Sequence, residues 1–129
     1  HLTQSWLLDD DNEMPRAVQL DIIDLGSTDT AHGVALSITD ACSLPQGAWA
    51  FSAVAENTKD SYQDGPCLAS ALGIVNANSK VVQLHHLQGA PKVEGITRQI
   101  SGNQLTLTLV TDADDPATAS QLLQVRLPY

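Results

Sequence analysis

The amino-acid sequence predicts an all-β protein made of antiparallel meander sheets. Three observations favour this fold class. Apolar and polar residues alternate with a period of two in several short segments, as they do on strands with one buried face. Clusters of Gly, Pro, Asn, Asp and Ser separate these segments and are typical of turns. In addition, one block of strands and turns occurs twice along the chain.

The length and composition are those of one folded domain. The chain has 129 residues, of which 43% are hydrophobic and only 4% aromatic, so we expect a core of aliphatic side chains. We predict a single β domain over residues 1–129. Its parts are an acidic N-terminal arm (1–16), a leading strand followed by a four-stranded unit (17–87), and a second unit of three strands (88–129).

The first part of the chain is acidic and then becomes apolar. The run from Asp9 to Glu13 in the arm is typical of a solvated segment. Residues 17–25, AVQLDIIDL, alternate apolar with polar side chains, which favours a strand. Pro15 and Gly26 would also suit the two ends of a helix, so this strand is predicted from the alternation.

Seven further strands are predicted in the two units. The first unit has strands at 34–40, 49–56, 70–75 and 81–87, connected by turns at 43–47 and 76–79 and by an acidic loop at 56–66. The second unit has strands at 93–99, 104–111 and 121–127, with an acidic turn at 112–116. Asp115 and Pro116 could instead begin a short helix ending near Gln124, but the repeat favours a strand.

The repeat sets the architecture. Residues 48–57 match residues 104–113 at an offset of 56 positions, so that Glu56 corresponds to Asp112, and an Ala-Ser-x-Leu step follows each acidic loop, at 69–72 and 119–122. A unit of about fifty residues with four strands has the size of a β-propeller blade. Closed propellers need about four to eight blades. Two units therefore predict a partial propeller, with the remaining blades supplied by the parent chain or by other copies in a homo-oligomer.

Three segments carry a resemblance to a known family. FSAVAENTKDSYQDGPCLASALGIV, KVEGI and LTLVTDADDPATASQLLQV resemble the C-terminal part of uncharacterised bacterial β-propellers that are similar to the phytase-like propellers with esterase-like activity. The most specific parts are Glu94-Gly95 and the turn at 111–116. The resemblance covers about residues 17–129 and implies hydrolysis of phosphate or carboxylic esters by metal-bound carboxylates that activate water.

Charge and cysteine content exclude several other classes. The net charge is −9, from fifteen acidic and six scattered basic residues, so a nucleic-acid partner is not expected. No apolar run approaches the roughly twenty residues that span a bilayer, and no signal segment begins the chain, which leaves the compartment open between cytoplasm and periplasm. Cys42 and Cys67 are predicted to lie two strands apart, beyond disulfide reach, as free thiols.

The acidic loops are the first candidate site. In a propeller blade these loops open on one rim together with the link at 88–92, which would gather six carboxylates: Glu56, Asp60, Asp64, Asp112, Asp114 and Asp115. Clustered carboxylates repel one another unless a cation is bound, and Ca²⁺ prefers such oxygen ligands. The match to a calcium loop is partial, because Tyr62 occupies a ligand position between Asp60 and Asp64. Alternatively, these side chains hydrogen-bond their own backbone in turns.

Asp40 and Glu94 are the second candidate site. Both are predicted on the innermost strands of their units, where they would face the central channel and bind a substrate or a cation. The alternative is that they accept hydrogen bonds from backbone amides at strand ends.

Three functions are consistent with these observations. The first is a partial propeller whose acidic rim binds a cation, such as Ca²⁺, or a small ligand. The second is the metal-dependent phosphoesterase or esterase that the resemblance implies. The third is a non-catalytic module that assembles with itself, pairing its edge strands at 17–25 and 121–127 between or within chains.

Overall fold

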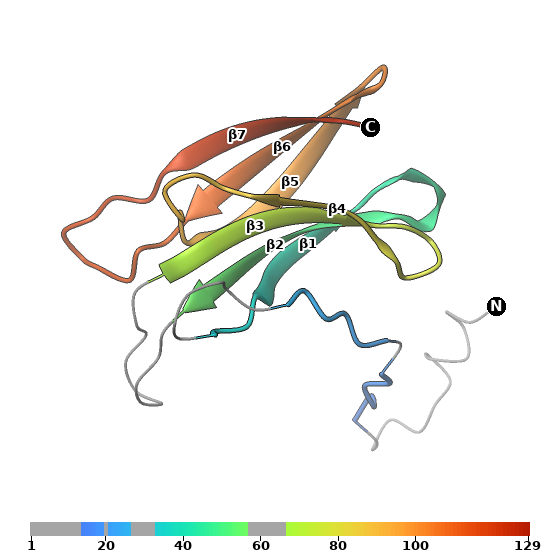
Figure 1. Cartoon of the computed structure of the whole chain (residues 1–129), viewed down its shortest axis with the longest axis horizontal. Helices are drawn as coiled ribbons and strands as arrows, with labels where there is room; N and C mark the ends of the chain where they lie inside the picture. Colours follow the sequence, from blue (N-terminus) through green and yellow to red (C-terminus); the bar gives the residue numbers. More distant parts are fainter. Residues whose placement is uncertain (1–13, 20, 27–32, 57–66) are drawn as a thin grey trace.

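Two antiparallel sheets make up the described part of the protein. The structure is a computed structural model that describes residues 14–19, 21–26, 33–56 and 67–129. Its strands are β1 (Ser37–Ser43), β2 (Trp49–Glu56), β3 (Cys67–Val75), β4 (Val81–His86), β5 (Val93–Ser101), β6 (Gln104–Thr111) and β7 (Leu122–Pro128). They form a four-stranded sheet in the order β1-β2-β3-β4 and a three-stranded sheet in the order β5-β6-β7 (Figure 1). The predicted all-β meander is confirmed.

The prediction of a strand at 17–25 is wrong for the described residues. Residues 17–19 and 21–25 belong to no strand, and the side chains of Val18 and Ile22 are 71% and 74% exposed. The end of the segment is held on the first sheet, because Leu25 packs there and the Gly26 carbonyl accepts a hydrogen bond from the Leu36 amide at 3.1 Å. An alternating sequence forms a strand only where a neighbouring edge satisfies its backbone groups, and this segment has none among the described residues.

The first strand lies three residues later than expected. It was predicted at 34–40, but β1 spans Ser37–Ser43, and the turn is confined to the 3-10 segment Pro45–Gly47. Pairing of β1 with β2 continues until Ser43 lies opposite Trp49, so only a tight reversal remains. Gln46 and Gly47 provide it with φ angles of 62° and 77°.

The last predicted strand is confirmed. Residues 122–128 form β7, and no helix follows Asp115. Leu127 is buried, and Leu123 and Val125 are half-buried against the core, whereas Gln124 and Arg126 between them are exposed. This period-two burial matches the alternation read from the sequence.

The core has two layers, one on each face of the first sheet. Between the sheets, aliphatic side chains of both form one cluster of buried residues: Leu44, Ala50, Leu72, Ile74, Val93, Ile96, Leu105, Leu107, Leu109 and Leu127. On the other face of the first sheet, Phe51 is the centre of a second cluster, which Leu25 and Val34 help to cover. The central strands β2 and β3 are therefore buried on both faces, by the second sheet on one side and by the cluster around Phe51 on the other.

The repeat also describes which way each sheet faces. At the offset of 56 positions, Phe51 and Ala53 of β2 correspond to Leu107 and Leu109 of β6. Phe51 and Ala53 lie on the face of the first sheet that points away from the second sheet. Leu107 and Leu109 lie on the face of the second sheet that points toward the first sheet. Equivalent faces of the two sheets therefore point in the same direction. The remaining face of the second sheet, which we call the outer face, corresponds to the face of the first sheet that is covered.

Polar contacts link the sheets along the line where β1 and β5 lie side by side, which we call the β1–β5 seam. Near its middle, the Asp40 carboxylate accepts a hydrogen bond from the Ile96 amide at 2.9 Å. Farther along, the Arg98 guanidinium donates to the Ser43 carbonyl at 2.8 Å. At the start of β5, Lys92 forms ion pairs that are described below. The seam therefore holds both sheets at several points along its length.

Both cysteines are free thiols, as predicted. Cys42 lies on β1 and Cys67 on β3, and β2 separates these strands in the sheet. Burial raises the pKa of each thiol above its ordinary value. Raised thiol pKa values favour the protonated, unreactive form, so neither residue has the properties of a nucleophile.

Candidate functional site

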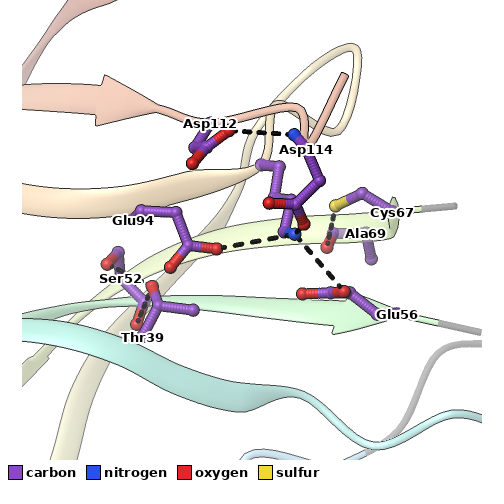
Figure 2. Close-up of polar contacts among 9 residues, drawn as sticks. Thr39, Ser52, Glu56, Cys67, Ala69, Glu94, Asp112 and Asp114 are labelled. Atoms are coloured by element: carbon purple, nitrogen blue, oxygen red, sulfur yellow. Dashed lines mark hydrogen bonds and ion pairs between the residues drawn. The ribbon is translucent and has the colours of Figure 1, made fainter. Parts of the chain in front are cut away.

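The ammonium group of Lys92 gathers carboxylates from three parts of the chain (Figure 2). Its Nζ lies 3.6 Å from Glu56 Oε2, at the end of β2, and 3.8 Å from Glu94 Oε1, on β5. It also pairs with Asp114 Oδ2, in the loop between β6 and β7. We call these four residues the Lys92 charge cluster. It lies at the end of the molecule where the first and second sheets meet.

Local backbone irregularities aim these side chains at one point. The pairing of β5 with β6 shifts between Val93 and Gly95, so Glu94 is the extra residue of a β-bulge. Lys92 is fixed by its own carbonyl, which accepts a hydrogen bond from the Asp112 amide at 3.0 Å. Asp114 has a φ angle of 56°, and its amide donates to Asp112 Oδ1 at 2.9 Å, which closes a tight turn.

Burial in the cluster increases toward the lysine. The Lys92 side chain is 11% exposed and that of Glu56 19%, whereas Glu94 and Asp114 are each 42% exposed. A lysine this buried requires partners of opposite charge. Among the described residues, three carboxylates surround one ammonium, so the cluster keeps an excess of negative charge on its solvent side.

The structure places the predicted rim residues in three ways. Glu56 and Asp114 converge on Lys92, and Glu94, predicted for a different site, joins them. Asp112 lies in the same loop as Asp114, where its carboxylate supports that residue's turn. Asp60 and Asp64 lie outside the described residues.

The carboxylate of Asp115 accepts hydrogen bonds from residues of its own loop. They come from the Ala117 amide at 2.9 Å and from the Thr118 hydroxyl at 2.8 Å. These two bonds, the backbone one first, hold the pKa of Asp115 below its ordinary value. For Asp112 and Asp115, the alternative that rim aspartates hydrogen-bond their own turns is confirmed.

Asp40 also has the structural role that was considered for it. Its carboxylate accepts a hydrogen bond from the Ile96 amide across the β1–β5 seam. Asp40 directly follows a shift in the pairing of β1 with β2, where Thr39 is the extra residue. The Thr39 and Ser52 hydroxyls, 2.7 Å apart, bond each other beside this bulge. Asp40 and Glu94 thus lie on β1 and β5, the first strands of the two sheets, and they contact different partners.

Lys92 is the site residue that sequence reasoning missed. The acidic turn at 112–116 contains no basic residue of its own, so its counterion comes from another part of the rim. The link at 88–92 was assigned to the same rim, and its lysine is the signal that could have identified the counterion. Within the described ranges, no group of three or more His, Cys, Asp and Glu side chains is arranged to hold a metal ion.

Fold and site together define an all-β protein of two successive meander sheets with a lysine–carboxylate cluster at one end. The model of a family of unknown function, DUF6910, matches residues 2–116. The chain belongs to this family. Comparison with curated proteins and comparison with solved structures each found no match. In the described part of the chain, no helix has the length and apolar character needed to cross a bilayer.

Proposed function

We propose that this chain is a non-catalytic assembly module of the partial-propeller type, which packs the outer face of its second sheet against a sheet of a second copy. The observation that carries this proposal is the equivalence of the two sheets. Ala50, Ser52 and Val54 of the first sheet are at most 4% exposed, because the second sheet covers them. Their counterparts at the offset of 56 positions, Thr106, Thr108 and Val110, lie on the outer face.

The composition of the outer face supports this role. Val110 is 41% exposed and its cross-strand neighbour Leu122 is 74% exposed. Thr108 and Thr106 continue the same face of β6, opposite Gln124 and Arg126 of β7. Branched and small side chains on a pleated surface suit packing against another sheet. Adjacent exposed apolar residues on one face are typical of an interaction surface.

Association of copies through the outer face can be tested by size-exclusion chromatography with light scattering. We expect a mass above that of the 13.7 kDa chain, increasing with protein concentration. Val110→Glu places a charge in the contact and should weaken association about tenfold or more. Val82→Glu, at a residue 54% exposed on β4, is the matched control and should leave association unchanged. A monomer at every concentration would overturn the proposal.

A second candidate function is the binding of a cation, such as Ca²⁺, at the solvent side of the Lys92 charge cluster. The excess of carboxylates there and the half-exposed Glu94 and Asp114 favour it. On this proposal, calorimetric titration with calcium gives an affinity of about 10⁻⁴ to 10⁻³ M, as for weak extracellular sites. The variant Glu94→Gln should lose most of it, whereas Asp24→Asn should not. No heat of binding for the unmodified chain would exclude this candidate.

The third candidate function, a phosphoesterase, rests on the resemblance to phytase-like propellers. The same samples can be assayed with a phosphate monoester, with and without a chelator. For an assembly module we expect no hydrolysis in either condition. Hydrolysis that the chelator abolishes would favour the enzyme instead.

A further inference from the structure

The outer face of the second sheet carries three cross-strand rows of residues. Residues directly opposite each other on neighbouring antiparallel strands lie on the same side of a sheet. Because Val110 lies on the outer face, its partners Gly95 on β5 and Leu122 on β7 lie there too. The register of β5, β6 and β7 gives the three rows: Leu122, Val110 and Gly95; Gln124, Thr108 and Thr97; Arg126, Thr106 and Gln99.

The first row projects at one end and is hollow at the other. Leu122 is 74% exposed and Val110 is 41% exposed, whereas Gly95 has no side chain. Apart from its neighbours in the chain, a Cβ atom added at Gly95 would lie within 4 Å only of Val110 Cβ, at 3.7 Å, and of Asp40 Oδ2, at 3.9 Å. In the described part of the protein, the row therefore has a projecting leucine on β7 and an open space on β5.

The charge of the three rows suits contact between identical surfaces. The chain has fifteen acidic and six basic residues, but none of the residues in the rows is acidic, and Arg126 is their only charged member. Two copies can therefore approach through this face with less of the repulsion that a net charge of −9 produces elsewhere. A second copy of this chain is the partner that fits this face.

We propose that two copies pack outer face to outer face about a twofold axis that runs parallel to β6, midway between the two sheets. This inference rests on the proposed function and adds the symmetry of its contact. Rotation about this axis places β7 of one copy over β5 of the other and keeps each residue's position along the strand. Leu122 then fills the hollow at the partner's Gly95, and Val110 meets the partner's Val110. The same patch serves both copies, as a closed dimer requires.

A twofold axis perpendicular to the strands would leave the hollow unused. It would place β7 over β7 of the partner, so that Leu122 would meet another side chain of β7 instead of Gly95. The axis parallel to β6 also keeps the two arginines apart, because Arg126 then lies over the partner's Gln99. Shape and charge therefore favour the axis parallel to β6.

An exchange of the leucine and the glycine tests this pairing. Gly95 does not have a positive φ angle, so its backbone accepts a side chain. Gly95→Leu fills the hollow and Leu122→Gly removes the side chain that enters it, so each should weaken the dimer about tenfold or more in light scattering. The double variant moves the leucine to β5 and the hollow to β7, and it should restore most of the association. Asn78→Leu, in the exposed turn between β3 and β4, is the matched control for an added leucine and should leave association unchanged.

The outcomes separate this symmetry from the proposed function. Circular dichroism establishes that each variant is folded. Two weak single variants without recovery in the double variant would overturn the pairing of Leu122 with Gly95. If either single variant associates like the unmodified chain while Val110→Glu does not, the symmetry fails and the proposed function stands. If the unmodified chain is a monomer at every concentration, both fail.

A distance between spin labels tests the axis without altering the contact. The label is attached at Asn103→Cys, in the turn between β5 and β6, in a chain that also carries Cys42→Ala and Cys67→Ala. With the axis parallel to β6, both turns lie at the same end of the dimer. We then expect the labels to be about 10–20 Å apart in electron paramagnetic resonance, since packed sheets are about 10 Å apart. An axis perpendicular to the strands would put the turns at opposite ends, roughly 30 Å apart, and this result would overturn the proposal.

Discussion

Replacement of Gly73 by alanine is expected to cost about 3 kcal/mol of unfolding free energy, at the upper end of the usual overpacking range. A Cβ atom at Gly73 would lie 2.2 Å from Phe51 Cζ, 2.5 Å from Phe51 Cε1 and 3.0 Å from the Gln83 carbonyl oxygen. Phe51 is fully buried and cannot turn away without displacing its cluster. Since native domains are stable by only about 5–15 kcal/mol, this is a large fraction of the total.

Thermal and urea unfolding followed by circular dichroism would measure the effect of Gly73→Ala. We expect a decrease in melting temperature of about 10 °C. Gly95→Ala is the matched control, because a Cβ there would lie 3.7 Å from Val110 Cβ and 3.9 Å from Asp40 Oδ2, which are ordinary contacts. It should change stability by less than about 1 kcal/mol. In the Gly73→Ala background, Phe51→Leu should recover part of the loss, because the two sites are in contact. Equal stability of the two glycine variants would contradict this explanation.

The second large loss of unfolding free energy is expected for Lys92→Met. This substitution removes the ammonium group and leaves the carboxylates of Glu56, Glu94 and Asp114 close together without it. Breaking a buried ion pair by deleting one partner typically costs about 3–5 kcal/mol. We expect the lower end of this range, because Glu94 and Asp114 are 42% exposed and can regain water. Urea unfolding at low and high sodium chloride provides the measurement. Added salt should reduce the difference in unfolding free energy between Lys92→Met and the unmodified chain, since salt screens the repulsion between the remaining carboxylates.

Two further variants identify the cause of that effect. Lys80→Met removes an exposed lysine from the turn between β3 and β4 and should be nearly neutral. Adding Glu56→Gln to Lys92→Met should restore part of the stability, because Glu56 is the most buried carboxylate of the cluster. If Lys92→Met were as stable as Lys80→Met, the cluster would have no role in holding the sheets together.

The strand that the sequence predicted best is β6, on which buried and more exposed side chains alternate along nearly its whole length. The alternation of Leu105, Leu107 and Leu109 therefore indicated β6 with its correct ends. The repeat was needed for β7, whose residues alone were compatible with a helix. The segment 17–25 shows the limit of this reasoning. Alternation indicates that a segment can form a strand, but it does not say whether an edge is available to it.

The candidate site could be predicted only in part, because its charges come from distant positions. Asp114 lies 22 residues from Lys92 in sequence, and Glu56 belongs to the other sheet. Placing the acidic loops and the link at 88–92 on one rim predicted that Glu56 and Asp114 would lie near each other, and both pair with Lys92. The bulge that aims Glu94 at the same point has no signal in the sequence. Lys92 belongs to neither acidic loop but to the link at 88–92, which is the third part of the same rim.

The β1–β5 seam has a mechanical consequence. Its polar contacts begin at Lys92, just before β5, and continue along β5 at Ile96 and Arg98, and each one reaches a different residue of the first sheet. A force that slides one sheet over the other would load these contacts simultaneously, whereas a force that peels the sheets apart from one end would break them one at a time. The molecule should therefore resist shear between its sheets more strongly than peeling.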